Sequence, residues 1–222
     1  MTFIIAEAGV NFRNFNEADE LIRLCSAAGV NAVKFQAHSD DIIYSLPNDL
    51  SKHLKSIQLN EERIRYLYWR CCQNKVEFMC TPMYSDAVKM LDPYVKRWKI
   101  REKDSQNFAL INKCIHTNKE VLISLQDPWD YPFNKIKQLY CIPEYPPKKG
   151  HDLINNYKGF DGVSCHYPCV PLALDFVKLG AKYLEIHVKK NEYPDNYEPI
   201  DNNVSITTDE LKELVDTIRS WE

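Results

Sequence analysis

The chain of 222 residues lacks any long apolar run, and it lacks a large excess of charge of either sign. No stretch approaches the ~20 consecutive apolar residues that a helix needs to cross a bilayer. The formal net charge is -3, which argues against non-specific binding to nucleic acid or to an anionic membrane. The N-terminus has neither the basic start nor the long apolar core of a signal peptide. These absences predict a cytoplasmic protein without nucleic-acid or membrane partners.

The eight cysteines lack the spacing of a zinc ribbon, and we expect no disulfide framework. A chain of this length can build its own core, so the cysteines within apolar patterns should be reduced and buried. These are Cys25, Cys72, Cys80, Cys114 and Cys141. Cys165 and Cys169 bracket His166, and a cysteine-based zinc site there is the alternative.

Apolar runs and helical stretches alternate along the whole chain. The predicted strands are residues 3–8, 32–37, 77–80, 97–101, 120–125, 138–142, 161–165 and 183–188. The predicted helices are residues 16–28, 61–72, 85–91, 108–116, 172–179 and 208–219. Several strands are continuously apolar, which is typical of parallel strands covered on both faces. The pattern predicts the α/β class and one (β/α)8 TIM barrel that forms a single domain over residues 1–222.

Two connections between the predicted strands carry little helical pattern. Residues 127–137 contain Pro128 and Pro132, and residues 143–158 contain three prolines. We therefore expect shortened crossovers after the fifth and sixth strands. A doubly wound open sheet is the alternative fold, but it usually carries a glycine-rich phosphate loop after its first strand. Gly9 is the only glycine in residues 8–13, so this loop is not glycine-rich.

Two histidines near the end of the chain, His166 and His187, each close an apolar run. A short predicted helix separates the runs, which makes a strand–helix–strand unit with parallel strands. Both imidazoles would then reach the carboxyl ends of neighbouring strands, where barrels bind ligands. The pair predicts the start of a divalent metal site. The other four histidines belong to no such group, and we expect them at the surface: His38, His53, His116 and His151.

Lysines within apolar strands give a second indication of a site. Lys34 lies in a strand pattern and would point into the barrel, where an unpartnered ammonium is costly. It should therefore meet an anion, either Glu7 or a bound phosphate or carboxylate. Lys99 raises the same question.

An ordered set of short motifs carries a resemblance to a known family. The motifs are residues 4–11 (IIAEAGVN), 32–36 (AVKFQ), 80–82 (CTP), 98–100 (WKI), 144–146 (EYP), 164–166 (SCH) and 185–188 (EIHV). In their order and rough spacing they resemble the N-acetylneuraminate (sialic acid) synthase family, over nearly the whole chain.

The resemblance implies a (β/α)8 barrel transferase that condenses phosphoenolpyruvate with an N-acylated hexosamine such as N-acetylmannosamine, to give a nonulosonic acid. It implies a divalent metal, first Mn²⁺ with Mg²⁺ or another ion as the alternative, held by His166 and His187 and polarising the sugar aldehyde. The catalytic residues implied are Glu7, Asp104 and His187. The residues implied for phosphoenolpyruvate are Lys34, Thr81, Lys99, Ser124, Tyr145 and Ser164.

The sequence departs from the family pattern at several points. Glu102 stands where the family has a phosphate-binding serine, and a carboxylate there would repel phosphate. The family's Gly-Pro-Asp-His segment is loosened at residues 193–196, and we expect its aspartate, Asp195, beside the site.

The resemblance also leaves the activity and the partners open. The sequence ends after its last predicted helix, and we expect a homo-oligomer or a partner chain to supply the family's C-terminal antifreeze-like domain. Glu102 keeps open a barrel aldolase, lyase or isomerase that acts on another, non-phosphorylated sugar acid. A non-catalytic binding subunit in surface-polysaccharide biosynthesis is the third reading.

Overall fold

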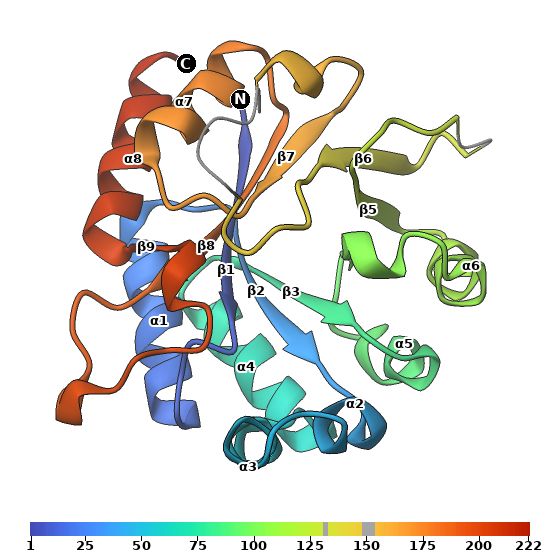
Figure 1. Ribbon diagram of the computed structural model, residues 1–222, viewed down its shortest axis with the longest axis vertical. Helices are drawn as coiled ribbons and strands as arrows, with labels where there is room; N and C mark the ends of the chain where they lie inside the picture. Colours follow the sequence, from blue (N-terminus) through green and yellow to red (C-terminus); the bar gives the residue numbers. More distant parts are fainter. Residues whose placement is uncertain (131–132, 148–153) are drawn as a thin grey trace.

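A computed structural model describes residues 1–130, 133–147 and 154–222. Pro132 and His151 lie outside the described residues. Eight parallel strands form a ring with helices on its outside (Figure 1). The strands are β1 (Phe3–Gly9), β2 (Ala32–Ala37), β3 (Glu77–Pro82), β4 (Arg97–Ile100), β5 (Glu120–Leu125), β6 (Ile136–Tyr140), β7 (Gly162–Cys165) and β8 (Tyr183–Lys189).

Backbone ladders join the strands in the order β3-β2-β1-β8-β7-β6-β5-β4. The ring is completed where β3 meets β4, and no backbone ladder joins these two strands within the described residues. The predicted (β/α)8 barrel is confirmed. The sixth strand begins two residues earlier than expected, because Ile136 already pairs with Val121 of β5. Strand pairing uses backbone groups, so the polar residues Lys137 and Gln138 can take part in it.

Six predicted helices cover the ring, and all of their ends lie within two residues of the expected ones. They are α1 (Phe15–Ala28), α4 (Glu61–Gln73), α5 (Ser85–Leu91), α6 (Phe108–His116), α7 (Val170–Lys178) and α8 (Thr208–Ser220). The Asn14 side chain accepts hydrogen bonds from the first backbone amides of α1, and Gly29 ends that helix at φ 89°. Thr207 and Glu210 form a capping box at α8. The sequence did not predict α2 (Asp40–Tyr44), α3 (Asn48–Ile57) or a short strand, β9 (Ser205–Thr207).

The crossovers after β5 and β6 are short, as predicted. Among the described residues, no helix follows β5, and β6 is followed only by a 3-10 turn, η2 (Asn155–Tyr157). Among these residues, too, no helix combines the length and apolar character that crossing a membrane requires.

The side chains that point into the ring form layers, because residues alternate between the two faces of each strand. An apolar layer fills the middle of the ring: Ile5, Ala32, Met79, Leu122 and Leu139. One step closer to the carboxyl ends of the strands, the inward positions become polar, with Glu7 on β1, Lys34 on β2 and Lys99 on β4. The apolar layer is therefore the floor under a polar pocket.

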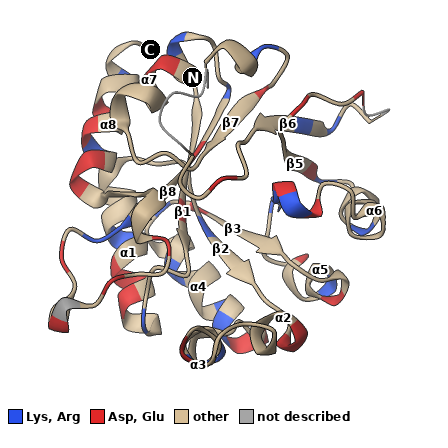
Figure 2. Cartoon of the chain, viewed as in Figure 1, with Lys and Arg blue, Asp and Glu red and all other residues tan. Residues whose placement is uncertain are grey.

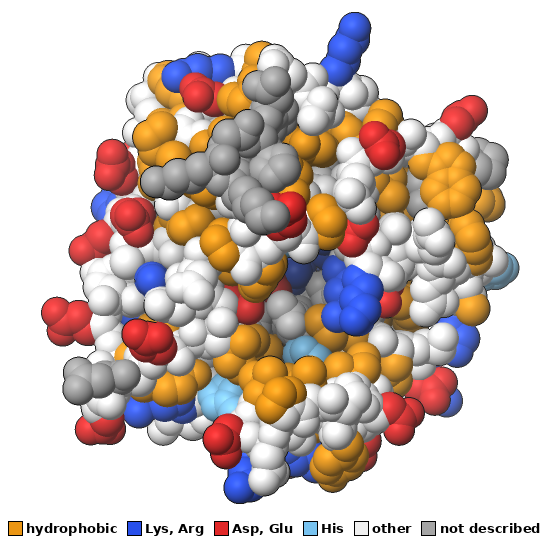
Figure 3. All heavy atoms as spheres, viewed as in Figure 1, with side chains coloured by type: hydrophobic (Ala, Val, Ile, Leu, Met, Phe, Trp, Pro, Cys, Tyr) orange, Lys and Arg blue, Asp and Glu red, His pale blue; other side chains and the backbone are white. Residues whose placement is uncertain are grey.

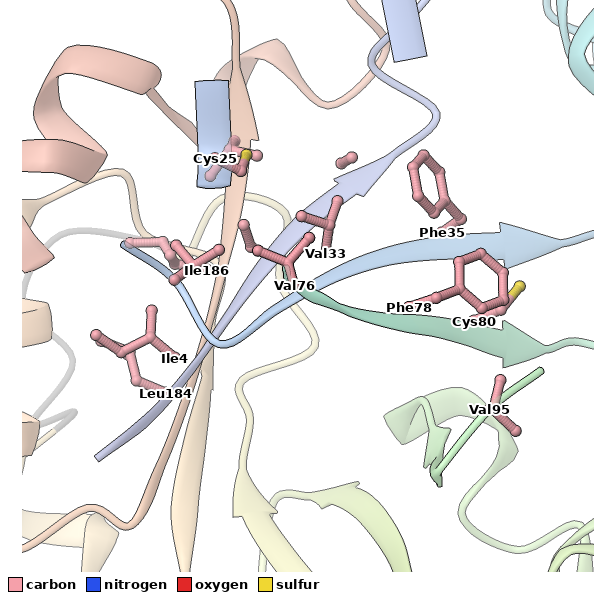
Figure 4. Close-up of a cluster of buried hydrophobic side chains, with 14 of the residues drawn as sticks. Ile4, Cys25, Val33, Phe35, Val76, Phe78, Cys80, Val95, Leu184 and Ile186 are labelled. Atoms are coloured by element: carbon pink, nitrogen blue, oxygen red, sulfur yellow. The ribbon is translucent and has the colours of Figure 1, made fainter. Parts of the chain in front are cut away.

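A larger apolar layer lies between the outside of the strands and the helices (Figure 4). It joins strand residues such as Val33 and Phe78 to helix residues such as Cys25. Charged residues lie mainly on the helices and loops, with a few on the central strands (Figure 2).

All eight cysteines are free, and seven are buried or half-buried. The expectation that Cys72 is buried is wrong. The buried stripe of α4 runs through Ile64, Leu67 and Cys71, so Cys72 falls on the exposed face of the helix.

Candidate active site

A cavity of 220 Å³ opens above the polar layer, at the carboxyl ends of the strands. Figure 3 shows this hollow near the centre of the molecule. The cavity brings together nearly all of the predicted site residues: Glu7, Lys34, Thr81, Lys99, Ser124, Tyr145, Ser164, His166 and His187. Gln36, Arg101, Glu102, Cys141, Glu185 and Asp201 also line it.

Lys34 meets an anion inside the barrel, as expected. Its Nζ lies 2.7 Å from Glu7 Oε2 and 3.5 Å from Glu185 Oε2, and it donates a hydrogen bond of 3.0 Å to Thr81 Oγ1. All four side chains are buried. Parallel pairing places Glu7 directly beside Lys34, so the contact follows from the register of β1 and β2.

Lys99 forms a second network on the opposite side of Glu185. Its Nζ donates to Ser124 Oγ at 2.8 Å and lies 3.4 Å from Glu185 Oε1. Ser164 Oγ donates to the same Glu185 oxygen at 2.7 Å. Glu185 therefore bridges both lysines, and we did not predict it as a site residue. The signal was its position two residues before His187, on the same inward face of β8.

The two buried carboxyl groups differ in acidity. Burial raises the pKa of Glu7 above its ordinary value, and the nearby Lys34 ammonium offsets only part of this effect. Burial also works to raise the pKa of Glu185, but Lys34 and Lys99 outweigh it and hold that pKa at about 2. Glu185 is thus a permanent anion, whereas Glu7 can hold a proton. Such divergent pairs are typical of acid–base assignments in enzymes.

The two predicted imidazoles are neighbours, with their ring centroids 5.2 Å apart. Tyr145 closes this part of the cavity. Tyr145 is half exposed, but its hydroxyl oxygen points inward and lies 3.1 Å from His187 Nε2. Asp201 Oδ2 lies 3.2 Å from His187 Nδ1 on the other side. Burial lowers the pKa of His166 to about 3, so its ring is neutral and keeps a lone pair for a ligand bond.

The donor chemistry of this corner fits a divalent ion. Neutral imidazole and carboxylate are ligands that Mn²⁺, Zn²⁺ and Fe²⁺ accept. Among the described residues, however, no three His, Cys, Asp or Glu side chains are arranged to hold an ion by themselves. The cysteine-based zinc alternative has no such cluster either, since Cys165 Sγ donates instead to the Tyr167 carbonyl oxygen at 3.4 Å.

Two acidic residues lie elsewhere than the sequence suggested. Asp104 does not line the cavity; its carboxylate pairs with Arg101, which does. Asp195 is 89% exposed and faces Arg13 at 3.6 Å, so the expectation that it borders the site is wrong. Asp201 occupies that place instead.

Strand β9 explains the difference between Asp195 and Asp201. Ser205 of β9 pairs with His187, which brings the preceding turn and Asp201 back over the barrel mouth. The signal was the short β-like run Ser205-Ile206-Thr207 before the capping box of α8, which we did not read as a strand.

Two of the histidines expected at the surface are half-buried instead. His38 follows β2, and burial, reinforced by the nearby Arg101, lowers its pKa to about 4. His53 stacks on Tyr197 with 6.0 Å between ring centroids. His116 is exposed, as expected.

Comparisons with known proteins agree with this architecture. The NeuB family model matches residues 21–126. This match confirms the predicted resemblance to the sialic acid synthases. This match runs from the middle of α1 through β5 and ends before the strands that carry His166 and His187.

Similar proteins match nearly the whole length of the chain. The spore coat polysaccharide biosynthesis protein SpsE of Bacillus subtilis is 26% identical over 258 residues, which cover 99% of this chain and 67% of that protein. The N,N'-diacetyllegionaminic acid synthase of Legionella pneumophila is 26% identical over 259 residues, which cover 99% of this chain and 72% of that protein. The solved N-acetylneuraminic acid synthetase of Leptospira borgpetersenii has the same fold, with a TM-score of 0.82 at 23% identity, covering 99% of this chain and 83% of that one.

Proposed function

We propose that this chain is a synthase that condenses phosphoenolpyruvate with an N-acylated hexosamine to form a nonulosonic acid. One observation carries the proposal: two adjacent imidazoles and two buried lysines converge on one cavity of the barrel. The names of the Legionella and Leptospira relatives support the nonulosonic acid class of product.

The chain's cations and hydroxyls suit a small anion. Lys34 with Thr81 would hold one end of phosphoenolpyruvate, and Lys99 with Ser124 and Ser164 would hold the other. Both lysines share Glu185, so part of their charge is already matched before a ligand enters. The site therefore favours an anion that also accepts hydrogen bonds from these hydroxyl groups over an anion bound only by the charge of the lysines.

His166 and His187 would hold the divalent ion, with Mn²⁺ the first candidate, and Asp201 would orient the His187 ring through its Nδ1. When bound, such an ion supplies a Lewis acid for the aldehyde oxygen of the sugar. Glu7 Oε2 lies 2.7 Å from Lys34 Nζ, and burial raises the pKa of Glu7, so its carboxyl group would hold or release a proton there.

The experiment is phosphate release from phosphoenolpyruvate with N-acetylmannosamine and Mn²⁺. We expect the wild type to release phosphate only with both additions, and His187→Ala to lose at least about 100-fold, the scale of removing a group at the reacting centre. His116→Ala changes an exposed histidine of α6 and should retain the wild-type rate. Metal-independent release, or an active His187→Ala, would contradict the proposal.

One observation favours a second candidate, an aldolase or lyase for a non-phosphorylated sugar acid. Glu102 lines the cavity and accepts a 2.7 Å hydrogen bond from Gln126. A carboxylate in this wall opposes a phosphate group. Metal-dependent cleavage of a sugar acid to pyruvate, without any turnover of phosphoenolpyruvate, would favour this candidate.

A further inference from the structure

Arg101 lies at the mouth of the barrel cavity, above Lys99, and both residues line that cavity. It follows β4 with extended backbone (φ -75°, ψ 161°), so its side chain points to the same side as that of Lys99 two residues earlier. Two residues of extended chain span about 7 Å. The Arg101 side chain is 32% exposed, whereas that of Lys99 is 2% exposed. Arg101 is therefore the more accessible of these two cations.

Arg101 also differs from the two lysines of the cavity in where its carboxylate partner lies. Lys34 and Lys99 contact Glu185, which itself lines the cavity. The partner of Arg101 is Asp104, which lies outside the lining. We propose that Arg101 binds a carboxylate or phosphate group of the substrate. The inference rests on the proposed function in one respect, since that group would belong to phosphoenolpyruvate.

Asp104 holds the guanidinium of Arg101 by one edge. The 3-10 turn η1 (Glu102–Asp104) brings Asp104 back to Arg101, whose Nε and Nη2 donate to its two carboxylate oxygens, the second at 3.5 Å. Within the described part of the chain, Arg101 Nη1 donates no hydrogen bond. A guanidinium carries five N–H donors in a rigid planar fork, so a second edge remains for a pair of ligand oxygens. Asp104 is thus a positioning residue that orients Arg101.

The neighbouring Glu102 opposes an anion in this wall, but a residue outside the lining holds its side chain. Glu102 Oε1 accepts a hydrogen bond of 2.7 Å from Gln126 Nε2, and Gln126 does not line the cavity. Arg101 supplies the compensating charge beside it. A guanidinium that donates two parallel hydrogen bonds binds an oxyanion more strongly than a neutral hydroxyl does. Arg101 thereby replaces the phosphate-binding serine whose position Glu102 takes.

The charge of Arg101 acts over the mouth of the cavity. Figure 3 shows Lys and Arg side chains at the rim of the central hollow. Burial lowers the pKa of His38 to about 4, and the charge of Arg101 adds to this effect, so its field reaches the end of β2. An anion that enters the cavity passes this positive rim before it meets the lysines below, which favours its capture.

The experiment is calorimetric titration of phosphoenolpyruvate, pyruvate and inorganic phosphate, each separately, into the full chain. We expect Arg101→Met to weaken phosphoenolpyruvate at least about tenfold, the scale of losing hydrogen bonds to a charged group. A parallel loss of pyruvate affinity assigns Arg101 to the carboxylate, and a parallel loss of phosphate affinity assigns it to the phosphate. Arg70→Met is the matched control, since Arg70 is 24% exposed, pairs with Asp19 and lies outside the cavity. It should bind as the wild type does.

Two further variants separate a binding role from a folding defect. Arg101→Lys keeps the charge but loses the planar fork, so it should recover only part of the affinity. Asp104→Asn should weaken phosphoenolpyruvate less than Arg101→Met does. It should have no further effect in a chain that already carries Arg101→Met, because Asp104 acts through Arg101. Additive losses would overturn the role of Asp104.

Equal affinities of Arg101→Met and wild type for phosphoenolpyruvate would overturn the inference. So would a wild type that binds none of the three anions at about 10 mM. The proposed function fails separately from this inference. If the wild type binds pyruvate, Arg101→Met loses that binding and phosphoenolpyruvate is never turned over, Arg101 keeps its role and the proposed function falls. If both chains bind and turn over phosphoenolpyruvate equally, the proposed function stands and this inference does not.

Discussion

At the scale of single residues, neighbours decide the chemistry of each group in this barrel. Glu7 and Glu185 are the same residue type in adjacent strands, and both are buried. Glu185 has two lysines within 3.5 Å and stays ionised, whereas Glu7 has one and can take up a proton. The residue type alone could not have assigned these different roles.

His38 gives a prediction about pH. Burial lowers its pKa to about 4 in the folded chain, against about 6.5 for an unfolded histidine. Between these values the unfolded chain binds more protons, so acid favours unfolding and the contribution of His38 to stability is lost as pH falls. Replacing His38 by Gln should therefore reduce the loss of stability between pH 6.5 and 4, measured by urea denaturation.

The control for the pH prediction is His116→Gln, which alters an exposed ring of α6. It should show the same pH dependence of unfolding free energy as the wild type. If His38→Gln also follows the wild-type curve, His38 is not the group that titrates in this range.

At the scale of elements, the buried side chain of Asn11 helps to hold the segment from β8 to β9 against the barrel. Asn11 Nδ2 donates to the Val188 carbonyl and to Ser205 Oγ, both at 2.9 Å. Its Oδ1 accepts from the Asp201 backbone N–H at 2.9 Å. Asn11 thus fixes the turn that places Asp201 against His187.

We predict that Asn11→Ala destabilises the chain by about 2–3 kcal/mol, because it leaves several buried polar groups without partners. Hydrogen exchange of residues 190–204 should become faster. Asn31→Ala is the matched control, since Asn31 accepts from the Ile4 backbone N–H and from Arg219, far from Asp201 in the fold. It should lower stability without faster exchange in residues 190–204, and equal exchange in both variants would refute the role of Asn11.

At the scale of the whole molecule, the barrel closes through side chains where its backbone ladder is missing. Arg97 of β4 donates to Glu77 of β3 at 2.8 Å and to Glu120 of β5 at 2.7 Å. Its guanidinium lies 4.2 Å from the centroid of the Phe3 ring, inside the ring of strands. These contacts join β3 to β4 at the end of the barrel opposite the site.

Arg97→Met keeps the aliphatic stem but removes this connection. We expect a loss of about 2 kcal/mol in unfolding free energy, since two charged hydrogen-bond partners are left without the guanidinium. Urea denaturation measures it. The comparison is Lys212→Met, which removes an exposed ion pair with Asp216 on α8 and should cost less than about 0.5 kcal/mol. Similar losses in both variants would show that Arg97 does not close the barrel.

The sequence alone determined the strands, most of the helices and the residues that face into the barrel. Hydrophobic periodicity and the order of the strands along the chain can be read from the sequence. Once a barrel is assumed, they place five side chains at the carboxyl ends of the strands: Glu7, Lys34, Lys99, His166 and His187. The short crossovers were also visible, because a proline in the interior of a helix removes a backbone hydrogen bond and clashes with the preceding turn.

Only the tertiary structure decided which polar groups meet. Two features depend on contacts between segments far apart in the chain: Asp201 lies beside the site in place of Asp195, and Glu185 lies between two lysines. No local pattern specifies the path of a loop such as residues 190–204, because its position follows from the pairing of β9 with β8 and from the Asn11 hydrogen bonds. Periodicity reports which face of a strand a residue occupies, whereas three-dimensional packing sets the distances on which charge and acidity depend.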